Sequence, residues 1–176
     1  MSKSNQAIKD ITLVSICAAI LFVQQLALSF LPNIQFSTLL IVVYAKVFGF
    51  KRTTMIIIVH VIVVNLLSPF GPMIPVYIPS MFVAWMLIPI LLSTVFKKLE
   101  SAYKLAIFGF IFGFVYGWIF IPVSVFILDI PFVAYLMMDL PFEFMMAISN
   151  FLTILWLYEP IKKILVMHRI RYDAIA

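Results

Sequence analysis

Three polar residues in the last third of the chain have the types and spacing to form a binding site. Asp139, Glu143 and Asn150 lie at positions i, i+4 and i+11, which places them close to one face of a helix. Ionisable groups at membrane depth are costly and are functional candidates by default, so Glu143 is a candidate ligand contact. Asp139 can instead cap a helix that has Pro141 in its first turn. Asn150 can instead form an interhelical hydrogen bond.

Motifs for enzymatic chemistry do not occur in the sequence. There is no G-x-x-x-x-G-K-[ST] loop, so the chain cannot hydrolyse ATP with a P-loop of its own. H-E-x-x-H, G-x-S-x-G and Cys–His pairings do not occur either. His60 has no second ligand at metal spacing, which favours packing against a neighbouring helix over metal binding. We therefore expect no enzyme activity, no cofactor and no metal site.

The composition indicates which solvent surrounds the chain. Hydrophobic residues make up 65% of it and charged residues 11%, whereas about 25% of residues are charged in ordinary soluble domains. A soluble domain of this size needs a polar surface, which these residues cannot supply. The net charge of +5 comes from small basic clusters between long apolar runs, and this distribution argues against a nucleic-acid partner. The composition therefore predicts an integral membrane protein.

Charge clusters and turns that contain Pro, Gly or Asn divide the chain into six apolar stretches. Their approximate limits are 11–31, 36–50, 53–67, 76–96, 105–128 and 141–166. The second and third are short, because a hydrocarbon layer about 30 Å thick needs some 20 helical residues. A helical hairpin that does not fully cross the membrane is the alternative there. The prediction is a single all-α domain, residues 1–176, formed by a bundle of six transmembrane helices.

The basic residues predict the orientation of this bundle. With six spans, every Lys and Arg falls on the same side, either at a terminus or in the loops after the second and fourth spans. These residues are Lys3, Lys9, Lys46, Lys51, Arg52, Lys97, Lys98, Lys104, Lys162, Lys163, Arg169 and Arg171. The opposite loops contain no Lys or Arg. The positive-inside rule then places both termini in the cytoplasm.

Polar and aromatic residues in the outer halves of the spans suggest the type of solute. The uncharged polar residues are Gln24, Gln25, Asn33, Gln35 and Asn65. Their amide groups suit a neutral or zwitterionic polar solute better than a metal ion. The aromatic residues at comparable or shallower depth are Tyr77, Trp85, Tyr116, Trp118 and Tyr135. Such residues are more often interfacial anchors, and the alternative is that a subset stacks on a planar ligand.

Two sets of small residues lie at helical spacing. One set recurs at every fourth position of the fifth stretch: Gly109, Gly113 and Gly117. The other lies in the first stretch: Ser15, Ala18 and Ala19. Small residues let another helix approach closely, so each set can serve packing within the bundle or docking of a partner helix.

Several short motifs follow one another along the chain in an informative order. The first is the turn Leu31-Pro32-Asn33-Ile34-Gln35, followed by an apolar stretch that ends at Val47-Phe48-Gly49. The second is the loop Ser68-Pro69-Phe70-Gly71. The third is Asp139-Leu140-Pro141-Phe142, then Ser149-Asn150-Phe151-Leu152, then Tyr158-Glu159-Pro160-Ile161-Lys162-Lys163. Together they resemble the substrate-binding S components of energy-coupling factor (ECF) vitamin transporters, over nearly the whole chain.

The resemblance implies a six-helix bundle in a prokaryotic cell membrane that binds a vitamin or related micronutrient near its outer face. It also implies docking on a transmembrane coupling subunit, which is itself bound to two ATPase subunits, and toppling in the membrane to release the substrate. The predicted substrate-binding residues are Asn33, Gln35, Trp85, Tyr116, Trp118, Asp139, Glu143 and Asn150. Family members commonly carry Ala-x-x-x-Ala on the first helix for docking. The nearest match here is Ser15-x-x-x-Ala19, so the predicted docking residues are Ser15, Ala18 and Ala19.

Two other functions remain open at this point. A standalone carrier or channel would transport its solute without an ATPase, with Glu143 as a proton site. A structural or assembly subunit would bind no small molecule. A chain with neither an ATPase motif nor an ion relay cannot drive accumulation alone, which favours the S component. The substrate stays open among a flavin, a pterin, pyridoxine, a queuine-like base and a larger corrinoid.

Overall fold

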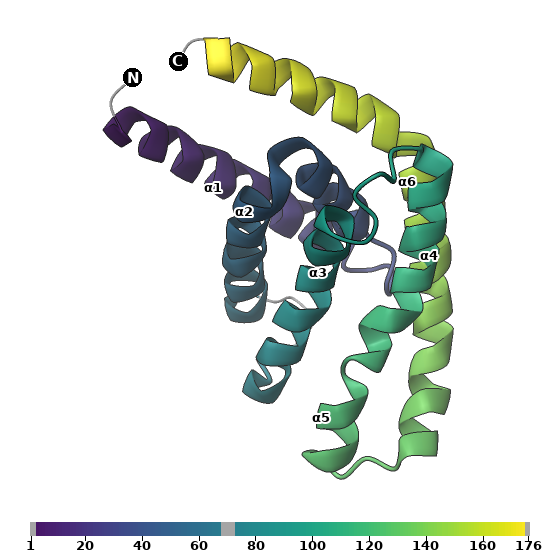
Figure 1. The fold of residues 1–176 in the computed structure, drawn as a ribbon. Coiled ribbons are helices and arrows are strands. Elements are labelled where there is room, and N and C mark those ends of the chain that lie inside the picture. Colours follow the sequence, from purple (N-terminus) through teal and green to yellow (C-terminus); the bar gives the residue numbers. More distant parts are fainter. Residues whose placement is uncertain (1–2, 68–72, 175–176) are drawn as a thin grey trace.

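The computed structural model describes residues 3–67 and 73–174, and this part of the chain is helical without any strand (Figure 1). The elements are α1 (Lys3–Ala27), α2 (Ser37–Leu66), the 3₁₀ helix η1 (Pro75–Tyr77), α3 (Ile78–Ser93), α4 (Ala102–Trp118), α5 (Ile121–Phe126) and α6 (Phe132–Ala174). Five helical segments in the described part are long and apolar enough to cross a membrane: 5–27, 37–66, 75–93, 102–126 and 132–169. The predicted all-α architecture is therefore confirmed, and the five long apolar segments are compatible with the predicted membrane character. The Ser68–Gly71 motif lies outside the described residues.

The helix α2 contains both the second and the third predicted stretch. Gly49 interrupts its helical backbone with φ 79° and ψ 177°. On one side of the break, the Lys46 ammonium donates to the carbonyl of Lys97, beyond the C-terminal end of α3, at 3.0 Å. On the other side, the Asn65 amide lies 3.3 Å from the sulfur of Met81, near the beginning of α3. The segment after Gly49 therefore runs antiparallel to α3, and the chain changes direction at this glycine.

Replacing Gly49 with alanine is expected to destabilise the protein by about 1–3 kcal/mol, because this backbone region is nearly exclusive to glycine. An added Cβ would meet no atom within 4 Å, so the cost comes from the backbone alone. Thermal unfolding of the detergent-purified protein measures it. Lys51→Ala is the control, since its side chain is exposed and its loss should leave the unfolding temperature unchanged. An unchanged unfolding temperature for Gly49→Ala would contradict the expectation.

Basic residues from distant parts of the sequence meet at one end of the bundle. Arg52 lies 2.8 Å from the carboxylate of Asp10, and Lys162 lies 3.2 Å from that of Glu100. Arg169 donates to a backbone carbonyl of α2. Both ends of the chain lie on this side as well, at the top of Figure 1. The contacts thus join the regions that the charge pattern assigns to one side, and the assignment of that side to the cytoplasm stays a prediction.

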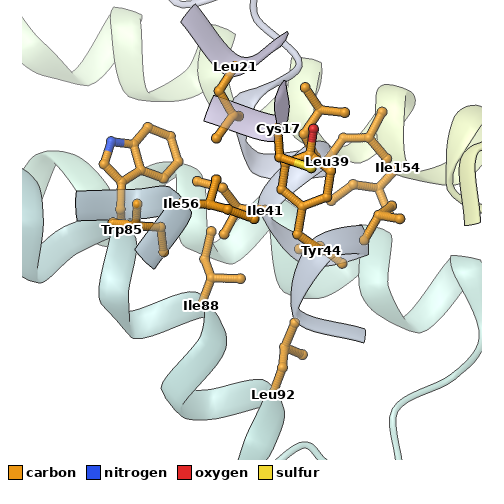
Figure 2. Close-up of a cluster of buried hydrophobic side chains, with 14 of the residues drawn as sticks. Cys17, Leu21, Leu39, Ile41, Tyr44, Ile56, Trp85, Ile88, Leu92 and Ile154 are labelled. Carbon is orange, nitrogen blue, oxygen red and sulfur yellow. The ribbon is translucent and has the colours of Figure 1, made fainter. Parts of the chain in front are cut away.

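The hydrophobic core lies where α1, α2, α3, α4 and α6 meet, and Figure 2 shows a close-up of it. Its largest fully buried side chains include Leu21, Ile41, Tyr44, Ile56, Trp85, Ile88 and Ile154. Cys17 is buried in the same cluster. The outward faces of the same helices carry many exposed large apolar side chains, among them Ile16, Ile62 and Ile111. Such surfaces are expected when lipid is the solvent.

The three glycines of α4 face α6. Cβ atoms added at Gly109, Gly113 and Gly117 would approach Ile154, Ala147 and Glu143 of α6. The closest backbone approach is at Gly113, where an added Cβ would lie 2.6 Å from the backbone nitrogen and Cα of Ala147. Packing within the bundle, one of the two interpretations of this set, is therefore confirmed.

Gly113→Ala is expected to destabilise the protein by about 1–3 kcal/mol, because overpacking a tight contact forces the backbones apart. Two helices have to move, since the contacted atoms belong to the backbone of Ala147. Thermal unfolding in detergent again measures the change. Ile111→Ala provides the control on the same helix, because this side chain is 56% exposed. Equal unfolding temperatures for Gly113→Ala and the control would contradict the tight α4–α6 packing.

Candidate binding cavity

A cavity of about 370 Å³ lies at one end of the bundle. The basic residues Arg52, Lys162 and Arg169, called the basic cluster below, lie at the other end. The cavity is formed by the loop after α1, by η1 and the beginning of α3, by the end of α4 and the segment that follows it, and by the first turns of α6. The lining residues are Asn33, Tyr77, Met81, Gly113, Tyr116, Gly117, Phe120, Tyr135, Asp139, Glu143 and Met146. A smaller cavity of about 160 Å³ shares Asn33 and Tyr116 with it and is also lined by Gln25 and Gln35. The two cavities thus form neighbouring parts of one candidate site.

Glu143 is the most unusual residue of this site. Its side chain is only 2% exposed, and neither of its carboxylate oxygens has a hydrogen-bond partner within the described part of the chain. The Trp118 indole N–H is a donor that interacts with this carboxylate, although the contact does not meet the geometry of a hydrogen bond. A buried polar group without partners is costly, and a buried charge is more so. The Glu143 carboxylate therefore lacks hydrogen-bonded donors among the described residues, and a ligand could supply them.

The absence of a side chain at Gly117 makes room for the carboxylates of Glu143 and Asp139. A Cβ added there would lie 2.3 Å from one oxygen of Glu143 and 2.7 Å from one oxygen of Asp139. The absence of a side chain on α4 therefore allows both carboxylates of α6 to occupy the space between the helices. Glycine serves close approach here, since its backbone is helical.

Aromatic rings form the opposite wall. The ring of Tyr116 lies 5.3 Å from that of Phe120, and the ring of Phe120 lies 5.5 Å from that of Tyr77. Trp85 packs behind Tyr116 at 4.9 Å and does not line the cavity. Rings at 4.5–7 Å support each other in tilted or edge-to-face arrangements. This wall is therefore preorganised for contact with a flat apolar surface.

The loop after α1 closes one side of the site. Asn33 adopts the left-handed conformation with φ 56°, which Asn tolerates better than most residues. Its amide nitrogen donates to the carbonyl of Phe142 on α6 at 3.1 Å. Gln24, at the end of α1, accepts from the backbone nitrogen of Phe36 at 2.8 Å. The first contact fixes the loop against α6, and the second ties the end of the loop to α1.

The structure brings some of the predicted site residues together and separates others. Asn33, Tyr116, Asp139 and Glu143 line the larger cavity, and Gln35 lines the smaller one. Trp118 is 51% exposed and does not line either cavity.

Asn150 lies outside the cavity, in the interior of the bundle. Its amide nitrogen donates to the carbonyl of Gly109 at 3.1 Å. This is the interhelical hydrogen bond that the sequence left as the alternative to a ligand contact.

The structure decides two further interpretations made from the sequence, and one of them needs correction. Asp139 does not cap a helix, because α6 begins at Phe132 and includes both Asp139 and Pro141 in its interior. His60 packs against Trp85, with ring centroids 6.3 Å apart, but neither of its ring nitrogens has a hydrogen-bond partner among the described residues. It therefore packs against a neighbouring helix, as the sequence indicates, without a hydrogen bond among the described residues.

Several lining residues were not among the predicted site residues. Tyr135 lies one helical turn before Asp139 and two turns before Glu143, so its spacing on α6 was a usable signal. Tyr77, Met81 and Phe120 come from other elements, and no spacing along the sequence connects them to α6.

The predicted docking residues are divided between two environments. Ser15 and Ala19 are exposed on α1, whereas Ala18 is 3% exposed and belongs to the core. Only Ser15 and Ala19 are thus accessible to another helix.

We found no match to the chain among protein-family models, curated proteins or solved structures. The functional conclusion therefore depends on the residues of this chain and on the geometry of the cavity.

Proposed function

We propose that the chain binds a vitamin or related micronutrient as the S component of an ECF transporter. The observation that carries this proposal is the cavity between α4, α6 and η1, with the buried and unpartnered carboxylate of Glu143. A concave site with aromatic walls and a few convergent polar groups is typical of small-molecule binding. Its position opposite the basic cluster corresponds to an outward-facing site if the positive-inside rule holds.

The six-span topology is part of this proposal. Gly49 divides α2 into residues 37–48 and 50–66, and each half would be one span. At 1.5 Å per residue the halves are about 18 and 26 Å long, which is shorter than the hydrocarbon layer. Local thinning of the bilayer and snorkelling of Lys46 and Arg52 would accommodate the mismatch. Both termini and the Gly49 turn would then be cytoplasmic.

The energy source is proposed to lie in separate subunits. The sequence has no P-loop motif, so ATP hydrolysis would come from two ATPase subunits through a transmembrane coupling subunit. The exposed face of α1, with Ser15 and Ala19 among large apolar side chains, supports docking of another transmembrane helix, because small residues allow close approach.

Reconstitution of ATP-driven uptake tests the proposal. The chain is purified in mild detergent from its native membrane together with the subunits that remain bound, and the assembly is placed in liposomes. We expect a coupling subunit and two ATPases in the assembly, and uptake of the bound small molecule only with hydrolysable ATP. Uptake by the chain alone, abolished in Glu143→Gln, would instead indicate a standalone carrier. Absence of both bound molecule and uptake would indicate an assembly subunit.

A further inference from the structure

We infer that the cavity selects a planar aromatic ligand whose edge carries hydrogen-bond donors or a positive charge, and that it rejects ligands with a carboxylate at that edge. This inference rests on the proposed function and deepens it by naming the class of substrate. It follows from a comparison of the acceptors and donors that the cavity offers.

The two carboxylates of the cavity can accept hydrogen bonds from a ligand. Both oxygens of the Glu143 carboxylate are buried and have no hydrogen-bond partner in the part of the chain that the structure describes. Asp139 is one turn away on α6 and lines the same cavity, where the Tyr135 hydroxyl interacts with it. Two carboxylates therefore converge on one space, beside the glycine that leaves room for them.

Three polar groups of the larger cavity already pair with groups of the protein. The Tyr77 hydroxyl pairs with that of Ser124 at 3.0 Å. The Tyr135 hydroxyl donates to the carbonyl of Gly117 at 3.3 Å, and the Asn33 amide donates to the carbonyl of Phe142 at 3.1 Å. The Tyr116 hydroxyl also lines both cavities, but two carboxylates face it from α6, so the open capacity of the larger cavity is mainly that of an acceptor. Hydrogen bonds form between a donor and an acceptor, so the missing donors have to come from the ligand.

No basic side chain offsets these carboxylates. Residues 10–45, 53–96 and 105–161 contain no Lys or Arg, and no lining residue of either cavity is basic. A ligand carboxylate would therefore meet like charge and no cation, which is unfavourable in a site shielded from water. A metal ion is a poor alternative, because the described residues contain no group of three or more His, Cys, Asp or Glu side chains that could hold one.

The shape of the ligand follows from the wall opposite the carboxylates. Tyr77, Tyr116 and Phe120 present rings at contact distance from one another, and flat heteroaromatic rings stack on such surfaces. The cavity of about 370 Å³ is near the lower end of ligand sites, which favours a ligand of one or two small rings over a corrinoid. A 2-amino heterocycle with an adjacent N–H can donate twice to one carboxylate, as a guanidinium does. A cationic ring is attracted to both the carboxylates and the aromatic wall.

A binding panel tests the inference on the full-length protein in detergent, after dialysis against buffer. Guanine, pterin and thiamin carry hydrogen-bond donors or a positive charge at a ring edge, and we call them donor-edged probes. The carboxylate-bearing probes are nicotinate, biotin and pantothenate. Calorimetry measures each affinity. We expect at least one donor-edged probe to bind about 10- to 100-fold more tightly than every carboxylate-bearing probe, as loss of charge-assisted hydrogen bonds implies. Comparing the affinities of guanine and pterin with that of thiamin shows whether hydrogen-bond donors at the ring edge or a fixed positive charge matters more.

A pair of variants locates the binding. Asp139→Asn is expected to weaken binding of the preferred probe about tenfold, because it removes a charge from the cavity. Asp129→Asn is the matched control: Asp129 is exposed and absent from the cavity lining, and asparagine tolerates its left-handed backbone. Equal losses in the two variants would overturn the assignment to this cavity.

The remaining outcomes separate this inference from the proposed function. Preferred binding of a carboxylate-bearing probe, weakened by Asp139→Asn or Glu143→Gln, would overturn the substrate class and leave the vitamin-binding function standing. Small molecules released from the wild-type protein by denaturation provide a second readout: a released molecule that has a carboxylate and no donor edge would have the same meaning. Absence of binding by every probe together with absence of any released molecule would overturn both.

Discussion

Glu143→Gln is expected to lower the affinity for the bound small molecule by about 10- to 100-fold. A hydrogen bond to a charged group contributes about 1.5–3 kcal/mol, and each 1.4 kcal/mol corresponds to a factor of ten in the dissociation constant. Glutamine keeps the shape of the side chain, but it loses the charge and replaces one acceptor oxygen with a donor. Equilibrium dialysis with the molecule extracted from the wild-type protein measures the change.

The same variant should fold at least as well as the wild type. Glu143 is buried without a hydrogen-bond partner in the described part of the chain, and replacing an unpaired buried carboxylate by an amide removes a destabilising group. Glu159→Gln is the matched control, because Glu159 is an exposed residue of the same helix. An affinity within twofold of the wild type for Glu143→Gln would show that the carboxylate is a structural group and not a ligand contact.

Gly117→Ala is expected to weaken binding about tenfold or more, because the new methyl group would occupy the space of the Glu143 and Asp139 oxygens. Binding sites need their groups held within about 0.5 Å of the productive geometry, and here the nearest carboxylate oxygen would start only 2.3 Å from the added Cβ. The carboxylate has to move, so its hydrogen bond to the ligand is lost or lengthened. Isothermal titration of the extracted ligand provides the measurement.

Gly113→Ala is the informative comparison for this variant. The two glycines lie one turn apart on α4, but the Cβ at Gly113 meets the backbone of Ala147, whereas the Cβ at Gly117 meets the ends of flexible side chains. Gly113 also lines the cavity, but its added Cβ would press on a backbone, so we expect Gly113→Ala to act more on stability and Gly117→Ala more on affinity. A loss of affinity in Gly113→Ala together with a loss of stability alone in Gly117→Ala would contradict the position of the carboxylates in the cavity.

The sequence predicted the features that depend on local composition and spacing. Long apolar runs predicted the helices that are long and apolar enough to cross a membrane, and the i, i+4 spacing correctly placed Asp139 and Glu143 on one face. Asn150 shows the limit of this reasoning. It shares that face, but it lies seven residues beyond Glu143, which at 1.5 Å per residue is about 10 Å further along the helix. A common face therefore did not mean a common cavity.

Two other features needed the tertiary structure. The beginning of α6 was placed too late, because two charged residues and two prolines suggested a loop over residues 129–141, whereas α6 begins at Phe132, directly after Pro131. Proline is favoured at the start of a helix, and the structure shows that Pro141 is accommodated inside it. The aromatic wall combines Tyr77, Tyr116 and Phe120 from separate elements, and only the packing of the helices brings these residues to one place.

Native mass spectrometry of the detergent-purified wild-type protein tests the central claim most directly, namely that the cavity holds a small molecule. We expect a discrete adduct with the mass of one molecule per chain, strongly reduced in Glu143→Gln and retained in Glu159→Gln. The mass of the adduct would also identify the ligand. A protein that carries no adduct as purified, and gains none after incubation with donor-edged and carboxylate-bearing vitamins, would contradict the account.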